Sequence, residues 1–245
     1  MRFGMKKKFL FLLLIISSSL SFLSAGDVAN FINLGFSKNG RYFTFGQYGY
    51  SISSEEAYAT IVTVDVVSNE FVQGSMMNAK EKYPLTPGDS GDGVLYQLIE
   101  NYAPVRKRLG ISYTTRGRLL YLSSSLTDDA RKSGLSDSSG LDNSITFRDF
   151  QTNTQYSVTL NQNVSNMGPN VSSTLSLDLI VQKSAGAIQR YTVGHPKFVR
   201  KGVMGYELES IILMPGGKGL VFIIARKYYG QSKVDVRYMV EAIKF

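Results

Sequence analysis

Hydrophobic and polar residues alternate along much of this chain. In Thr174–Lys183 every second residue from Leu175 to Val181 is leucine or valine, and the residues between them are mostly polar. Because successive side chains of a β-strand point to opposite faces, this alternation predicts a half-buried strand. The same pattern predicts strands at Tyr58–Val67, Arg118–Ser123, Ser144–Phe150, Gln155–Leu160, Leu208–Met214, Leu220–Lys227 and Val234–Lys244. We therefore expect a mainly-β fold of antiparallel sheets, with turns such as Ser68-Asn69 between strands.

One segment near residues 93–108 has helical spacing instead. Its apolar residues recur three or four positions apart between Val94 and Tyr102, which is typical of an amphipathic helix. Gly110 stands where a left-handed residue can end the helix, and Pro104 is expected to kink or shorten it. Residues able to cap its start are Asp89, Ser90 and Asp92. The sequence therefore predicts one helix inserted into the β-fold.

The first 26 residues have the pattern of an export signal. A basic head is followed by the apolar run Phe9–Ile16, and Ser24-Ala25-Gly26 offers a small-residue cleavage site before Asp27. The apolar run is shorter than the about 20 residues that cross a bilayer, and three serines interrupt it, so a cleaved signal is favoured over a retained anchor. We expect a signal peptide at residues 1–26 and a single mainly-β domain at residues 27–245, secreted or periplasmic.

The charge of the chain depends on this leader. The full chain has 27 basic and 19 acidic residues, and four of the basic ones lie in residues 1–26, which contain no acid. The remaining 23 basic residues against 19 acidic ones give residues 27–245 a formal net charge of +4, which is ordinary for a soluble protein. Because no aromatic-basic motif accompanies this charge, nucleic acid is not an expected partner.

The chain contains no cysteine. An exported protein without cysteine has neither disulfides nor a lipid-modified cysteine, so its hydrophobic core alone must hold the fold together. No second long apolar segment follows the leader, and no transmembrane helix is therefore expected after signal cleavage.

A weak internal repeat pairs an apolar strand, a turn of glycine and a basic residue, and a second apolar strand. The three copies are Asn33–Phe45, Ile111–Leu122 and Ile211–Phe222. These hairpins resemble those of TolB-type β-propeller repeats, with the key glycines at Gly40, Gly117 and Gly217. The glycines are 77 and 100 residues apart, whereas a propeller blade takes about 40–45 residues. Propeller-like hairpins and a β-sandwich therefore both stay open as arrangements.

The exported part as a whole resembles a family of bacterial predicted secreted proteins of unknown function. The segments that carry the resemblance are Phe31–Ser37, Arg41–Phe43, Phe45–Gly49 and Gly205–Ser210. The resemblance implies export, and it brings no activity or site residues with it.

The string Gly88-Asp89-Ser90-Gly91 is similar to the surroundings of the nucleophile in chymotrypsin-like proteases. That chemistry needs a histidine base held by an acid. The single histidine, His195, follows the serine, whereas in that family it precedes it. A capped loop entering the helix explains these residues, and we expect no catalytic residue among them.

No pattern predicts a metal or cofactor site. Asp89 and Asp92 supply only two carboxylates, fewer than a calcium site needs, and the acidic stretch from Asp128 to Asp142 has no ligand periodicity. A lone histidine without cysteine cannot form a zinc site. The turn at His195 is followed by Lys197, Arg200 and Lys201. These cations could contact an anionic envelope component, but we expect a solvated loop.

The expected function is non-enzymatic: an exported binding or envelope-associated protein, with a cell-envelope protein or a glycan as its partner. Four tyrosines could line a sugar or peptide surface, although their positions also suit ordinary strand residues: Tyr42, Tyr48, Tyr50 and Tyr58. One alternative is a secreted hydrolase that uses two carboxylates converging in one cleft. A weaker alternative is an outer-membrane β-barrel, suggested by the final strand ending at Phe245.

Overall fold

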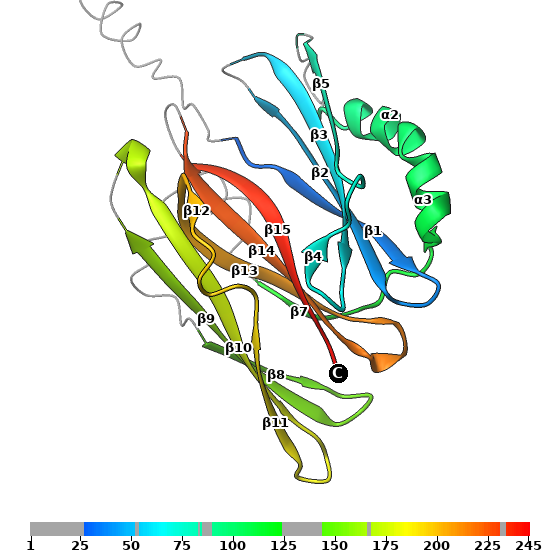
Figure 1. Cartoon of the computed structure of the whole chain (residues 1–245), viewed down its shortest axis with the longest axis vertical. Helices are drawn as coiled ribbons and strands as arrows, with labels where there is room; N and C mark the ends of the chain where they lie inside the picture. The colour runs from blue at the N-terminus through cyan, green and yellow to red at the C-terminus, as the bar shows by residue number, and fades with distance from the viewer. Residues whose placement is uncertain are drawn as a thin grey trace, which may run out of the picture.

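The computed structural model describes residues 27–51, 54–82, 84, 90–123, 144–165, 168–230 and 234–245. Within these ranges the chain forms three antiparallel sheets and two α-helices (Figure 1). The expected signal peptide, Asp89 and the acidic stretch Asp128–Asp142 lie outside the described residues. The mainly-β prediction is confirmed.

The first sheet, which we call the helix-covered sheet, has the strand order β4-β3-β2-β1-β6, and β5 pairs with β3. Its strands are β1 (Asn30–Ser37), β2 (Tyr42–Ser51), β3 (Glu56–Asp65), β4 (Glu70–Phe71), β5 (Met77–Lys82) and β6 (Ile111–Ser112). The helices α2 (Gly93–Asn101) and α3 (Ala103–Leu109) lie along its outer face (Figure 1).

The other two sheets are built from the second half of the chain. The central sheet has the order β15-β14-β13-β7, and in the outer sheet β11-β10-β9-β8 is extended by β12, which pairs with β10. Central strands are β7 (Arg118–Leu122), β13 (Val203–Leu213), β14 (Gly219–Tyr229) and β15 (Val234–Lys244). Outer strands are β8 (Ser144–Asp149), β9 (Thr154–Ser165), β10 (Ser172–Gln182), β11 (Ile188–Val193) and β12 (Arg200–Lys201). Two short 3-10 turns, Gly168–Asn170 and Pro215–Gly217, join strands.

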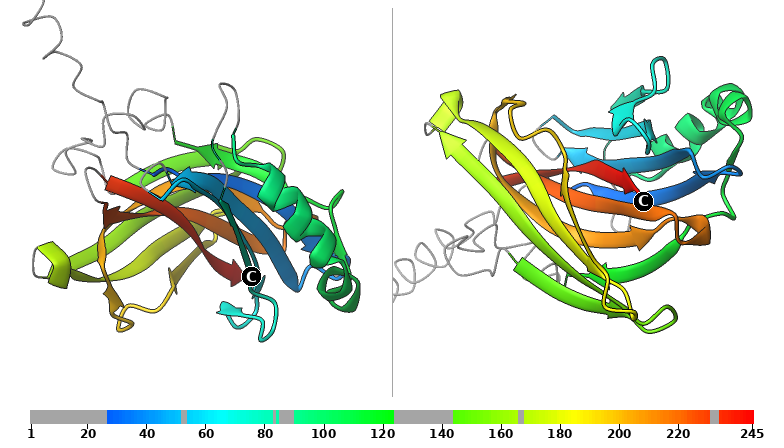
Figure 2. Two further views of the ribbon diagram at one scale, coloured as in Figure 1. Left: turned by 90° about the horizontal axis from the view of Figure 1, so that it is seen from above. Right: turned by 60° about the horizontal axis from the view of Figure 1, so that its bottom comes forward.

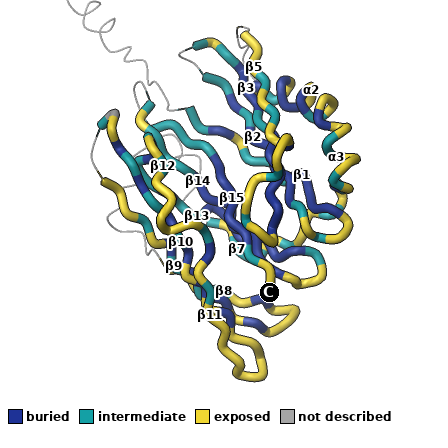
Figure 3. The backbone as a smooth tube through the Cα atoms, in the orientation of Figure 1, coloured by how far each residue is buried: buried dark blue, intermediate teal, exposed yellow. Residues whose placement is uncertain are grey.

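The central sheet is buried on both faces. One face packs on the helix-covered sheet through residues such as Ile223 and Phe43, and the other packs on the outer sheet through residues such as Phe222 and Leu177. A strand covered on both sides needs apolar residues at every position, and β14 accordingly begins with seven consecutive buried residues. Figures 2 and 3 show this stack of layers and the buried strands at its centre.

The outer sheet keeps the alternation that the sequence predicts. Along β10 the leucines and Val181 are buried against the central sheet, and the residues between them are partly or fully exposed. Because only one face is covered, the period of two survives in the sequence, and this strand could be recognised from it.

The predicted helix at residues 93–108 is present but divided. α2 ends at Tyr102, and α3 begins at Ala103 with Pro104 in its first turn, where the missing N–H of proline costs no hydrogen bond. Asp92 occupies the N-cap position of α2 without a side-chain cap bond, and Gly110 ends α3 with a φ of 65°. The fully buried Tyr102 anchors the junction through a hydrogen bond with Thr63 of β3.

The resemblance to propeller repeats is wrong as a guide to the arrangement of sheets, because these sheets stack face to face and do not close into a propeller. Gly40 and Gly217 do lie between paired strands, β1 with β2 and β13 with β14. Gly117 does not, because β6 pairs with β1 in one sheet and β7 pairs with β13 in another. The glycine turn there carries the chain from the helix-covered sheet to the central sheet.

The two-layer contact between the central and outer sheets can be tested on β10. Leu179 is 1% exposed and faces the central sheet, whereas its neighbour Ile180 is 38% exposed on the opposite face. We expect Leu179→Ala to lower the free energy of unfolding by about 2–5 kcal/mol, because it leaves a cavity in the core. The matched control Ile180→Ala should cost about 1 kcal/mol or less in the same urea titration. Equal losses for the two variants would contradict the assigned faces.

Candidate functional site

A pocket of about 410 Å³ opens along the edge of β15. Its walls come from β3, β4 and the turn between them on one side, and from β12 and the β11–β12 connection on the other. In Figure 1, β4 and β12 lie on either side of β15. The base is formed by side chains of β14 and β15. The pocket therefore lies where both covering sheets meet an edge of the central sheet.

Glu241 is the acidic group at the base of this pocket. It is 2% exposed, on the face of β15 that points toward the outer sheet, opposite Phe222 of β14. Asn69 Nδ2 donates a hydrogen bond to one carboxylate oxygen, and Arg200 Nη2 lies 3.1 Å from the other. Gly194 lies so close that an added Cβ would meet the carboxyl carbon at 3.3 Å. The carboxylate is thus held from three segments of the chain.

Asn69 connects this carboxylate to the backbone of β15. Its Oδ1 accepts a hydrogen bond from the N–H of Ala242 at 2.7 Å, while its Nδ2 donates to Glu241. The backbone of Asn69 has a φ of 58°, a conformation that asparagine tolerates better than most residues. The β3–β4 turn therefore fixes the edge of β15 and orients Glu241.

Arg200 brings a cation to the same place. Its side chain is 11% exposed, and its guanidinium carbon lies 5.1 Å from the centre of the Phe198 ring and 5.9 Å from that of Tyr206. One terminal nitrogen, Nη2, reaches Glu241. The other, Nη1, is buried and has no hydrogen-bond partner among the described residues.

Arg226 is a second, partly buried cation of the pocket. It donates from Nη2 to the carbonyl oxygen of Tyr238 at 3.3 Å and lies over the ring of Tyr228, while its buried Nε has no hydrogen-bond partner in the described part of the chain. Burial lowers the pKa of the Arg226 guanidinium, and the positive charge of Arg200 lowers it further. Two guanidinium groups thus stand close enough to repel each other at one pocket.

Burial shifts the pKa of the acidic group, Glu241, in the opposite direction. It raises the pKa of Glu241, although the hydrogen bond from Asn69 and the positive charge of Arg200 work against it. The loss of hydration thus outweighs these two contacts.

Aromatic side chains flank this charged base. Phe71 of β4 and Phe198 of the β11–β12 connection both line the pocket, and they are 56% and 60% exposed. Single exposed apolar residues are common on protein surfaces, but these two line the same pocket. The pocket therefore combines apolar walls with a base of buried charges.

A family model described as "Predicted secreted protein (DUF2259)" matches residues 44–244. The chain belongs to this family. No curated protein matches the chain. Membership confirms the expected resemblance to predicted secreted proteins of unknown function, and the family description names no activity.

The structure changes the interpretation of the basic residues after His195. The expected solvated loop is wrong for Arg200, which is packed against Glu241 in the pocket, although Lys197 and Lys201 are exposed. His195 itself lines the pocket. The structure thus brings one of these three cations to a site that could hold an anion.

Other residues considered from the sequence lie elsewhere. Tyr48 and Tyr50 pack against the helices, and Tyr58 belongs to the core between the helix-covered and central sheets. Over the described ranges no group of three or more His, Cys, Asp or Glu residues could hold a metal ion. No helix within those ranges is long and apolar enough to cross a membrane.

Sequence reasoning missed Glu241, Arg226 and Asn69 as parts of one site. A signal existed for Glu241, because it stands between apolar residues in the buried part of β15. A charged residue at such a position needs a partner or a function.

The burial of Glu241 predicts an unusual pH dependence of stability. The raised pKa means that the unfolded chain releases this proton at a lower pH than the folded protein does. The stabilisation associated with the protonated carboxyl is complete below pH about 4.5 and is lost as the pH rises through the higher pKa of the folded state. We expect the unfolding free energy of the wild type, relative to that of Glu241→Gln, to fall between pH 4 and 7 in urea titrations.

The matched control is Glu81→Gln on β5, where the side chain is exposed. Its difference from the wild type should stay level over the same pH range. A wild-type advantage over Glu241→Gln that grows with pH would show that the ion pair with Arg200 outweighs burial.

Proposed function

We propose that this member of the secreted family is exported by residues 1–26 and acts as a non-enzymatic binding protein, and that the pocket at β15 takes a small organic anion with an apolar body. The observation that carries this proposal is the pair of partly buried arginines, Arg200 and Arg226, each with a buried N–H donor that has no hydrogen-bond partner among the described residues.

The unpartnered donors cost the folded protein free energy. A buried N–H without an acceptor loses its hydration and gains nothing in return, at about 1–3 kcal/mol and more when the group is charged. An anion in the pocket would reduce the repulsion between the two guanidinium groups, and rotation of these side chains would turn their unpartnered donors toward it. Carboxylate and phosphate groups are the anions whose geometry matches guanidinium donors.

The residues that line the walls of the pocket indicate the size and the apolar part of the ligand. Phe71 and Phe198 offer apolar ring surface at the pocket, and a volume of about 410 Å³ suits a small molecule. Glu241 stands beside Arg200 and would repel a second negative charge at that point. The pocket therefore favours a compact molecule with one anionic group and an apolar or planar body.

The alternative of a carboxylate-dependent hydrolase finds less support. Such a mechanism uses two acids that act together on one bond. Of the two acids that line the pocket, Glu70 is exposed on β4, and both oxygens of Glu241 already accept hydrogen bonds or ion-pair contacts. This arrangement favours holding a ligand over transferring a proton to it.

The test is calorimetric titration of the purified protein with phenylacetate, phenyl phosphate, glucuronate and inorganic phosphate, with phenylacetamide as the neutral counterpart of the first. We expect phenylacetate or phenyl phosphate to bind more tightly than phenylacetamide and inorganic phosphate. Glucuronate binding in place of the aromatic anions would identify an acidic glycan instead.

Two variants then test whether the anion binds in the pocket at β15. Arg226→Met keeps an apolar stem of similar length but removes the charge, and it leaves the contact between Arg200 and Glu241 in place. We expect it to weaken anion binding about 10-fold to 100-fold, the range of a lost charged hydrogen bond. Arg190→Met, on the exposed strand β11, is the control and should bind like the wild type. Unchanged affinity in a folded Arg226→Met protein, or no binding of any of these anions, would refute the proposal.

A further inference from the structure

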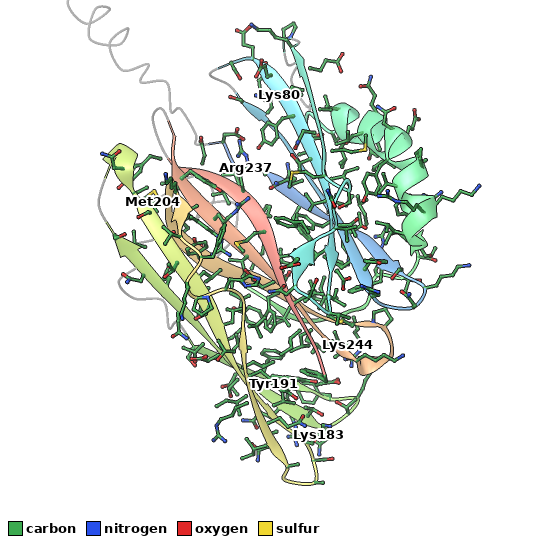
Figure 4. The ribbon with its side chains drawn as sticks, viewed as in Figure 1. Lys80, Lys183, Tyr191, Met204, Arg237 and Lys244 are labelled. Atoms are coloured by element: carbon green, nitrogen blue, oxygen red, sulfur yellow. The ribbon has the colours of Figure 1, made fainter. Side chains whose placement is uncertain are left out.

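The first described residue, Asp27, lies in a cluster of charges at the start of β15. Its backbone N–H donates to Asp235 Oδ1 at 2.9 Å. Its carboxylate accepts a hydrogen bond from Tyr58 at 2.7 Å and lies 2.6 Å from Arg237 Nη2. Figure 4 shows Arg237 at this end of β15. Asp27 is also the residue that the expected signal cleavage would leave as the new N-terminus.

The backbone of this segment is fixed as firmly as its side chain. Val28 forms a parallel bridge with Val236, the Ala29 N–H donates to the Val236 carbonyl at 3.1 Å, and the Val236 N–H donates to the Asp27 carbonyl at 2.9 Å. Ala29 is 1% exposed. Asp27–Ala29 therefore extend the central sheet by a short segment beside β15, and the nitrogen of Asp27 has one defined position.

Within the described part of the chain, this cluster joins two carboxylates and one directly paired cation. The carboxylates are those of Asp27 and Asp235, and the cation is Arg237, whose guanidinium also lies 4.3 Å from the centre of the Tyr58 ring. Its cross-strand neighbour Arg226 adds a positive charge nearby, but Arg226 donates to the Tyr238 carbonyl. A positive charge at the nitrogen of Asp27 would give the Asp235 carboxylate, which accepts from that nitrogen, a cationic donor.

A peptide N–H at this position offers one donor and no charge. A free α-amino group, which is protonated at neutral pH, offers three donors and a full positive charge. The carboxylate of Asp235 is within reach of it, since Asp235 already accepts from this nitrogen. An ammonium–carboxylate contact in a partly buried place is stronger than the neutral hydrogen bond that it replaces.

We propose that the bond between Gly26 and Asp27 is the processing site of this protein, and that the α-ammonium group released there is captured by Asp235. Cleavage by hydrolysis adds one water, giving a carboxylate on the leader and an ammonium group on Asp27. The resulting ion pair locks the new N-terminus onto β15, so that processing stabilises the folded protein. This inference rests on the export part of the proposed function, but it uses neither the pocket nor a ligand, so its test and the anion-binding test can fail independently.

The experiment expresses the full chain in an exporting bacterial host and identifies the first residue of the purified product by mass spectrometry. We expect the product to begin at Asp27. It then compares four proteins: the wild type, an insertion of Gly-Ser between Gly26 and Asp27, Asp235→Asn, and the insertion combined with Asp235→Asn. The insertion keeps a peptide N–H on Asp27 and moves the ammonium group two residues away.

The insertion should lower the Tm by about 2–8 °C, the shift that corresponds to one strong polar contact in a domain of this size. In the Asp235→Asn background the same insertion should change the Tm little, because the partner of the ammonium group is already gone. Asp178→Asn, on the exposed face of β10, is the matched control and should leave the effect of the insertion unchanged.

Three results would overturn the proposal. The first is a wild-type product that begins at another residue. The second is an insertion product, confirmed by its mass, with the Tm of the wild type. The third is an insertion that lowers the Tm equally with and without Asp235. If Asp235→Asn does not accumulate, the mass and the Tm of the insertion product decide alone.

Discussion

The burial of the central sheet on both faces is the constraint on which this structure depends. A strand inside such a sheet can carry charge only where a covering layer recedes or supplies a partner. Along β14 the first seven residues are buried, and Arg226 comes only after them. The edge strand β15 carries its charges at Asp235, Arg237 and Glu241, where the turn at Asn69 and the N-terminal segment reach it. The candidate pocket and the contact of the N-terminal segment therefore both lie along this edge.

Two neighbouring arginines on that edge differ in how they are satisfied. Arg237 is paired with Asp27, so its charge is balanced within the protein. Arg226, directly across the sheet, rests on an aromatic ring and a backbone carbonyl, and keeps a donor unpaired among the described residues. The same strand pair thus carries Arg237, which is paired within the protein, and Arg226, which keeps an N–H donor without a partner among the described residues. The difference arises because the N-terminal segment reaches β15 but not β14.

Much of the fold was predictable because its determinants are local. Alternation identifies β10, and Pro104 predicts the division between the two helices, since these signals depend on neighbours along the chain. The turn at Gly117 was wrongly predicted to join two paired strands, because a glycine turn has the same sequence pattern whether its flanking strands pair with each other or belong to different sheets. The pocket could not be predicted, because Asn69 and Glu241 are 172 residues apart in sequence. No short sequence pattern indicates a contact between residues so far apart.

The meeting of the N-terminal segment with β15 also has a consequence for folding kinetics. Asp27 contacts Asp235 across 208 residues, and β15 is the final strand of this chain. Contacts of such long sequence separation form slowly, because a large loop must close before they contribute. The pairing of Asp27–Ala29 with β15 therefore forms only after segments about 200 residues apart have met, which places it among the late steps of folding. Folding rate, and not only stability, thus depends on this contact.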